Sequence, residues 1–250
     1  MSDQILIDHK DGYAIVTNNK PARRNALGTQ SMAELYAALL DLEKDPECKA
    51  VVLTGAAPAF CAGSDLKELG GLSIPDMCAH EAETARIARQ IGMLSIPVVA
   101  AVEGYALGGG FILATSCDIV VSAASTKWNM PEVRNGWIPP WGLQTLAART
   151  SAANARLITW GVLEIDGAEA LRLGVADVIA PDGEALVAAC GIAKRLADLP
   201  ANAVASTKRF FETTATADAE RQDAEANRLF GLDCQSEAAK AVLAKFTVAR

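Results

Sequence analysis

An apolar run without polar alternation, Val98-Val99-Ala100-Ala101-Val102, most constrains the fold of this chain. A strand in a half-exposed sheet alternates apolar and polar residues, because successive side chains point to opposite faces. A strand without that alternation is buried on both faces, so helices must cover both sides of its sheet. Similar runs occupy residues 50–55 and 118–122, with helical patterns between them at residues 77–94 and 110–116. The alternation of strands and helices predicts an α/β fold with right-handed crossovers.

The two ends of the chain carry different patterns. Residues 5–8 and 13–17 alternate around Lys10-Asp11-Gly12, which predicts a β-hairpin, and helical spacing predicts a helix over residues 29–45. Beyond residue 140 the strand signals fade, and helical patterns dominate at residues 141–150, 152–161, 167–173, 184–199, 201–214 and 217–244. We therefore expect an α/β core over residues 1–195 and a C-terminal helical region over residues 196–250 that serves oligomerisation.

Length and composition exclude several classes of protein. The 250 residues suffice for a large domain, and 51% of them are hydrophobic, which predicts a substantial core. A net charge of −7 argues against a nucleic-acid surface. No apolar run reaches the roughly 18 residues of a membrane span, and the first residues lack a signal-peptide pattern. We expect a cytoplasmic protein without nucleic-acid or membrane partners.

Cysteine and histidine give no sign of a metal site. The six cysteines form no CxxC pair, and their apolar neighbours are typical of reduced packing residues. The two histidines have no partners at ligand spacing. We expect no metal, and we expect His80 to be solvated on a surface helix.

Three glycines, Gly108-Gly109-Gly110, stand where the apolar run at 98–102 leads into a helical pattern. Glycines there let the backbone approach a ligand closely, and unpaired N–H groups at a helix start stabilise negative charge. A second such segment covers residues 60–66, and Glu132 stands alone among apolar neighbours. Two backbone donors and one desolvated base suit the formation of an enolate. Taken alone, the triplet also fits close packing of a helix on a strand.

Five segments in order along the chain carry a family resemblance. They are Arg24-Asn25-Ala26-Leu27, Val51-Val52-Leu53-Thr54-Gly55, Phe60-Cys61-Ala62-Gly63-Ser64-Asp65-Leu66-Lys67, Gly104-Tyr105-Ala106-Leu107-Gly108-Gly109-Gly110 and Pro131-Glu132-Val133. Together they resemble the crotonase superfamily, which includes enoyl-CoA hydratases and isomerases. The resemblance implies a crotonase-like α/β superhelix of ββα units with a C-terminal helical trimerisation region. It also implies an acyl-CoA substrate, with coenzyme A entering as part of the thioester rather than as a cofactor, and a homotrimer or dimer of trimers.

The same resemblance assigns roles to individual residues. The backbone N–H groups of Ser64 and Gly109 hold the thioester oxygen, and Glu132 transfers the proton. Substrate contacts are implied for Ala26, Ala62, Asp65, Leu66, Lys67, Gly108, Ile112, Trp137 and Trp141. Asp65 also fits a helix cap. Lys208 fits a solvated helix face, although relatives place a lysine near a CoA phosphate there.

Ile112 decides which reaction the sequence favours. Hydratases of the superfamily have a glutamate two residues after the glycine triplet, whereas this chain has Ile112, which cannot accept a proton or orient water. A single glutamate, here Glu132, is the arrangement of the Δ3,Δ2-enoyl-CoA isomerases. Bulky residues after it, including Trp137 and Trp141, also resemble isomerases, and together with Trp128 they predict a pocket wall. We therefore expect an isomerase.

Decarboxylase and ring-forming members of the superfamily are not excluded by missing residues alone, and two further alternatives stay open from the sequence. A hydratase remains if another acid reaches the site, for which Glu68, Glu81, Glu83 and Glu103 are the candidates. A catalytically silent CoA-binding protein is the other alternative. A carboxylate kept in an apolar segment counts against it, because burial without a use is costly.

Overall fold

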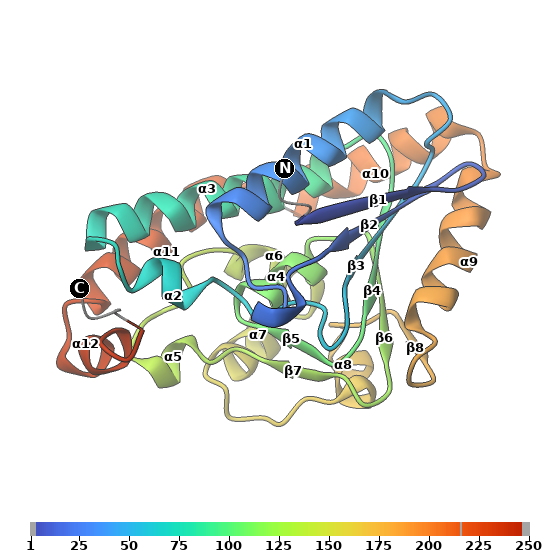
Figure 1. Ribbon diagram of the computed structural model, residues 1–250. Coiled ribbons are helices and arrows are strands. Elements are labelled where there is room, and N and C mark those ends of the chain that lie inside the picture. Colours follow the sequence, from blue (N-terminus) through green and yellow to red (C-terminus); the bar gives the residue numbers. More distant parts are fainter. Residues whose placement is uncertain (1–3, 216, 247–250) are drawn as a thin grey trace.

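The main sheet has six strands in the order β1-β2-β3-β4-β6-β8. The computed structural model, shown in Figure 1, describes residues 4–215 and 217–246. The strands are β1 (Ile5–His9), β2 (Ala14–Asn18), β3 (Val51–Gly55), β4 (Val98–Val102), β6 (Ile119–Ala123) and β8 (Val178–Ala180). β1 and β2 form an antiparallel hairpin, and each later pair of neighbours in the sheet is parallel. The predicted hairpin and parallel α/β sheet are confirmed.

Helices cover both faces of this sheet, as the unbroken apolar strands predict. On one face Val99 and Ala101 of β4 pack in a cluster with Ala189 of α9 (Ala185–Ala197). The opposite face packs against α1 (Thr29–Lys44), α3 (Ile74–Met93) and α4 (Gly109–Thr115), and Figure 1 shows α9 on the far side of the sheet from α1 and α3. All five residues of β4 are buried because both faces are covered.

A small second sheet carries the segments that the motifs singled out. β5 (Tyr105–Leu107) pairs in parallel with β7 (Lys127–Asn129), and Cys61 bridges to Ala106 on β5. The sequence analysis did not predict these two strands, because three residues are too few to show a period.

The remaining helices include the C-terminal ones. They are a 3₁₀ turn at Pro21–Arg23 and the α-helices α2 (Leu66–Leu69), α5 (Glu132–Asn135), α6 (Leu143–Arg149), α7 (Ala152–Thr159), α8 (Gly167–Leu173), α10 (Ala201–Ala215), α11 (Ala219–Asp233) and α12 (Glu237–Leu243). Helices α10 and α11 pack along α3. Within the described ranges, no helix is long and apolar enough to cross a membrane.

Two features of the C-terminal half differ from the expectations. β8 is a strand that was not predicted between the helical patterns at residues 167–173 and 184–199, because three residues are too few to show a period. The single helix expected over residues 217–244 is two helices, because Ser236 caps the start of α12 by accepting from Ala239 N. The proposed boundary at residue 195 falls in the last turn of α9 and stays a prediction. Residues 247–250 of the expected C-terminal region lie outside the described residues.

Lys208 on α10 is buried rather than solvated. Its Nζ donates to Ile91 O at 2.8 Å, to Ile96 O at 2.9 Å and to Asp118 Oδ2 at 2.8 Å. These three acceptors lie at the end of α3, in the loop that follows it and next to β6. One ammonium group therefore ties the C-terminal helices to the core.

We predict that Lys208→Met destabilises the protein. Removing the ammonium leaves two carbonyls and a carboxylate without their donor, which costs about 2–4 kcal/mol in the free energy of unfolding. Urea denaturation of the variant and of the wild type measures this loss in the free energy of unfolding. Lys194→Met, which removes an exposed lysine paired with Asp11 and Asp198, is the matched control, and we expect its stability to stay close to that of the wild type. Equal stability of the two variants would contradict this role for Lys208.

Candidate active site

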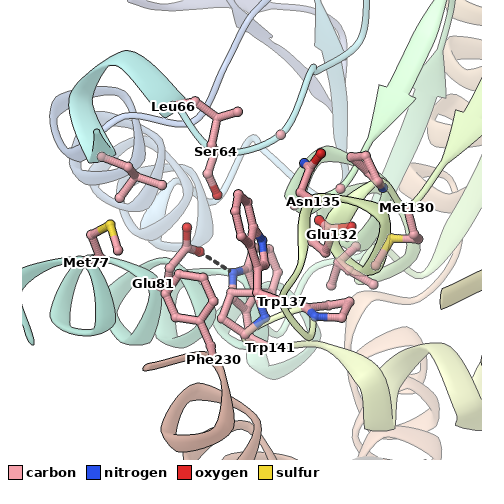
Figure 2. Close-up of a pocket in the computed structure, with 18 of the residues that line it drawn as sticks. Ser64, Leu66, Met77, Glu81, Met130, Glu132, Asn135, Trp137, Trp141 and Phe230 are labelled. Carbon is pink, nitrogen blue, oxygen red and sulfur yellow. Dashed lines mark hydrogen bonds between the residues drawn. The ribbon is translucent and has the colours of Figure 1, made fainter. Parts of the chain in front are cut away.

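A cavity lies between α2, α3, the segment after β7 and the C-terminal helices, and Figure 2 shows the residues around it. Most lining side chains are apolar. The polar side chains that line it are Ser64, Glu81, Glu132 and Asn135. Of the predicted site residues, the cavity gathers Ala62, Ser64, Leu66, Gly108, Gly109, Ile112, Glu132, Trp137 and Trp141.

The backbone around Ser64 and Gly109 supplies two free donors. Leu107 N donates to Cys61 O at 3.0 Å, which fixes the two segments side by side. A β-carbon on Gly63 would lie 2.8 Å from Leu107 O and 3.4 Å from Gly109 N, so only a glycine allows this approach. No acceptor in the described part of the chain takes the N–H of Ser64 or of Gly109, the first residue of α4. Both residues line the cavity, where these N–H groups can bind an oxygen.

Glu132 lies beside these donors. It follows β7 and begins α5, and it is 8% exposed. A β-carbon on Gly108 would lie 2.4 Å from Glu132 Oε1, so the carboxylate packs directly on the glycine that precedes Gly109. Oε2 of Glu132 has no hydrogen-bond partner within the described residues. A buried carboxylate with a free oxygen is equipped to accept a proton.

The surroundings of Glu132 favour its protonated form. Burial raises the pKa of Glu132 to about 8, against the opposing effect of its own backbone N–H, and the charge of Glu81 adds to the rise. A carboxylate with such a pKa both takes and returns a proton near neutral pH.

Glu81 is the second acid of the cavity, and it is 2% exposed. Trp141 Nε1 donates to Glu81 Oε2 at 2.8 Å. Burial raises the pKa of Glu81, while hydrogen bonding from Ser64, the nearby His80 and the Trp141 indole oppose the rise. Glu81 stands four residues after Met77 and four before Ala85, so helical spacing alone places it on the apolar face of α3.

The other three candidate acids act elsewhere. Glu68 accepts from Thr29 N at the start of α1, and Glu83 pairs with Arg86 on the exposed side of α3. Glu103 accepts from Ala185 N at the start of α9. Glu81 is thus the member of this group that lines the cavity.

Three predicted contact residues do not line the cavity. Asp65 accepts from the backbone N–H groups of Lys67 and Glu68 and forms ion pairs with Lys20 and Arg23, so its interpretation as a helix cap is confirmed. Ala26 is buried, and Lys67 is exposed. Their contacts with coenzyme A stay predictions.

Trp128 was expected in the pocket wall, but it does not line the cavity. Its ring packs edge-on against Phe111 with centroids 5.1 Å apart, and its Nε1 donates to Ser122 Oγ at 3.1 Å. It is a core residue, whereas Trp137 and Trp141 line the cavity. His80 is half-buried rather than solvated, since its Nε2 is buried without a partner in the described chain.

Several lining residues were not among the predicted site residues, and three of them, Met77, Phe230 and Leu243, come from distant segments. The lining residues that were not predicted are Leu69, Met77, Met130, Pro131, Asn135, Pro139, Pro140, Phe230 and Leu243. Phe230 and Leu243 belong to α11 and α12, and Trp137 stacks edge-on with Phe230 at 6.2 Å between centroids. The apolar periodicity of the C-terminal helices signalled burial but not the partner against which they pack.

Comparisons with known proteins agree with this architecture. A family model described as enoyl-CoA hydratase/isomerase matches residues 8–247. A probable enoyl-CoA hydratase of Rhizobium meliloti is 35% identical over 250 residues, covering 97% of this chain and 96% of its own. A probable enoyl-CoA hydratase of Mycobacterium bovis is 34% identical over 217 residues, covering 85% of this chain and 84% of its own.

Solved structures show the same fold. The crystal structure of an enoyl-CoA hydratase/isomerase from Mycobacterium paratuberculosis superposes with a TM-score of 0.89 at 29% identity, covering 98% of this chain and 99% of that chain. The predicted crotonase-like fold is therefore confirmed. Because the family model spans nearly the whole sequence and these relatives match along most of their length, the chain belongs to the enoyl-CoA hydratase/isomerase family of the crotonase superfamily.

Proposed function

We propose that this protein isomerises enoyl-CoA thioesters, with Glu132 moving a proton from C2 to C4 of the acyl chain. The observation that carries the proposal is the placement of Glu132. Its carboxylate packs on Gly108, next to the free N–H of Gly109, in an apolar cavity. A base beside an oxyanion site is the arrangement that enolate formation needs.

In the proposed reaction the thioester oxygen accepts hydrogen bonds from Ser64 N–H and Gly109 N–H. Glu132 removes a proton from C2 of a 3-enoyl thioester, and the electron pair of the broken C–H bond passes into a dienolate whose charge rests on the oxygen. The two N–H groups stabilise that charge more than they stabilise the neutral carbonyl. Glu132 then returns the proton at C4, so the double bond moves to C2–C3 and no atom is gained or lost.

Ile112 supports isomerisation over hydration. Its side chain is 1% exposed and lines the cavity. A β-carbon on Gly142 would lie 2.0 Å from Ile112 Cγ2, so this apolar side chain is packed against the loop before α6. Nothing at this position can hold or activate a water molecule.

Glu132→Gln is the test of the proposed base. We expect the variant to lose isomerisation of a 3-enoyl-CoA and hydrogen–deuterium exchange at C2 by a factor of roughly 10²–10⁴, the usual contribution of a general base. NMR of the exchanged thioester measures the loss. Glu83→Gln, on the exposed side of α3, is the control and retains activity. If the Glu132→Gln variant turned over at the rate of the wild type, Glu132 would not be the base.

The pH dependence of kcat/KM tests the raised pKa. Glu132 acts as a base only when ionised, and its pKa in the free protein is about 8. We therefore expect kcat/KM to fall tenfold for each pH unit below that pKa and to level off above it. If kcat/KM instead fell only below the ordinary glutamate pKa of about 4.3, burial would not be raising the pKa of the catalytic base.

Hydration of a 2-enoyl-CoA is the second candidate function. Two observations favour it: the relatives above are named as hydratases, and Glu81 lines the same cavity as Glu132. In that reaction Glu81 would take the place of the missing second acid and help to hold the water molecule.

A comparison of both reactions on the wild-type protein separates the two candidates. If no second acid holds water, isomerisation should exceed hydration by about 10²–10³, the cost of losing one such partner in the transition state. Rates on 3-enoyl-CoA and 2-enoyl-CoA substrates of short, medium and aromatic acyl chains give the ratio. Hydration as fast as isomerisation would make hydratase the better description.

We also propose that the protein assembles as a homotrimer or a dimer of trimers. Trp160 is 54% exposed and Val162 is 63% exposed. Large apolar side chains on the surface support a contact between copies.

A further inference from the structure

Glu81 lies beside two side chains that also close over Gly109. A β-carbon on Gly109 would lie 3.1 Å from Trp141 Cζ2 and 3.6 Å from Ser64 Oγ, so both side chains pack on this glycine. Trp141 donates its indole N–H to Glu81. The hydroxyl group of Ser64 lies close enough to Glu81 to lower the pKa of its carboxyl group. Figure 2 shows Glu81 with Ser64 and Trp141 around it.

We infer that Glu81 is a positioning residue for the oxyanion site, fixing the residues that supply and flank its two N–H donors. Ser64 supplies one donor, and Trp141 packs against Gly109, which supplies the other. Glu81 stands on the long helix α3, whose buried face packs into the core, so it is a rigid anchor. This inference rests on the proposed function, because it gives Glu81 a role in stabilising the enolate.

The contacts argue for positioning rather than for direct proton transfer. One oxygen of Glu81 is already bound by Trp141. From Glu81 the contacts run through Trp141 to Gly109, and on the other side Gly108 contacts Glu132. These contacts link Glu81 to the oxyanion site through the indole. A buried carboxylate is costly without partners, and here its hydrogen-bond partner is the Trp141 indole, which packs on Gly109.

The contacts of Glu81 are expected to preorganise the two oxyanion donors. Oxyanion donors contribute most when they are fixed before the charge develops, because no reorganisation is then needed in the transition state. If the hydrogen bond to Glu81 is lost, the Trp141 ring that packs on Gly109 gains freedom. Stabilisation of the enolate should weaken, while binding of the rest of the acyl-CoA should not.

Three variants test this role. Glu81→Leu removes the carboxylate and its hydrogen bond from Trp141, Trp141→Phe keeps an aromatic ring but removes the indole donor, and Glu81→Gln keeps the size and an acceptor oxygen. The probes are acetoacetyl-CoA, whose bound enolate is followed by near-ultraviolet absorbance, and an acyl-CoA thioether, which has no carbonyl oxygen. Exchange at C2 is measured on a saturated acyl-CoA. Glu83→Leu, on the same helix but outside the cavity, is the matched control.

We expect Glu81→Leu and Trp141→Phe to lower exchange by at least about tenfold and to reduce the bound enolate, since displaced donors lose part of their effect. The Kd of the thioether should change less than about threefold, because it makes no oxyanion contact. Glu81→Gln should keep exchange within about threefold of the wild type, because its amide oxygen can still accept the Trp141 hydrogen bond.

Two results would overturn the positioning role of Glu81. If Glu81→Leu and Trp141→Phe exchange at the wild-type rate, Glu81 does not position the site. If Glu81→Gln is as impaired as Glu81→Leu, the charge or proton of Glu81 matters rather than its hydrogen bonds, and the positioning role is again overturned. Should Glu81→Leu fail to fold, Trp141→Phe and Glu81→Gln decide the question. A wild-type protein that exchanges no C2 proton would instead refute the proposed function.

Discussion

The close approach of two backbone segments at Gly63 and Gly109 is the contact on which the rest of the site depends. A β-carbon at Gly63 would collide with Leu107 O, at 2.8 Å, so no other residue allows the same approach. The bridge between Cys61 and Ala106 holds the segments in register. This backbone contact places both N–H donors in one cavity, whichever acyl group the protein accepts.

The two buried carboxylates of the cavity differ in what surrounds them. Glu132 keeps one oxygen without a partner in the described residues, while Glu81 is bound by the Trp141 indole. Burial raises the pKa of both groups. Their hydrogen bonding then separates them: a free oxygen suits a group that exchanges protons, and a bound one suits a group that holds its neighbours in place.

Much of the fold and the centre of the site could be predicted from the sequence because those signals are local. Unbroken apolar strands such as β4 require cover on both faces, and the glycines beside Ser64 and Glu132 belong to contiguous motifs. The role of Glu81 was harder to predict, because a charged residue between His80 and Ala82 suggests a surface. Helical spacing places it on the buried face of α3, but its partner Trp141 lies 60 residues further along the chain, a contact between distant segments that no local pattern encodes.

The most direct test of the central claim is a crystal structure of the Glu132→Gln variant with a bound acyl-CoA thioester. We predict the thioester oxygen within about 2.7–3.1 Å of both Ser64 N and Gly109 N, the distances expected of oxyanion donors. C2 of the acyl group should face the side chain at position 132. A thioester oxygen bound by other groups, or an acyl group that turns C2 away from position 132, would contradict the account.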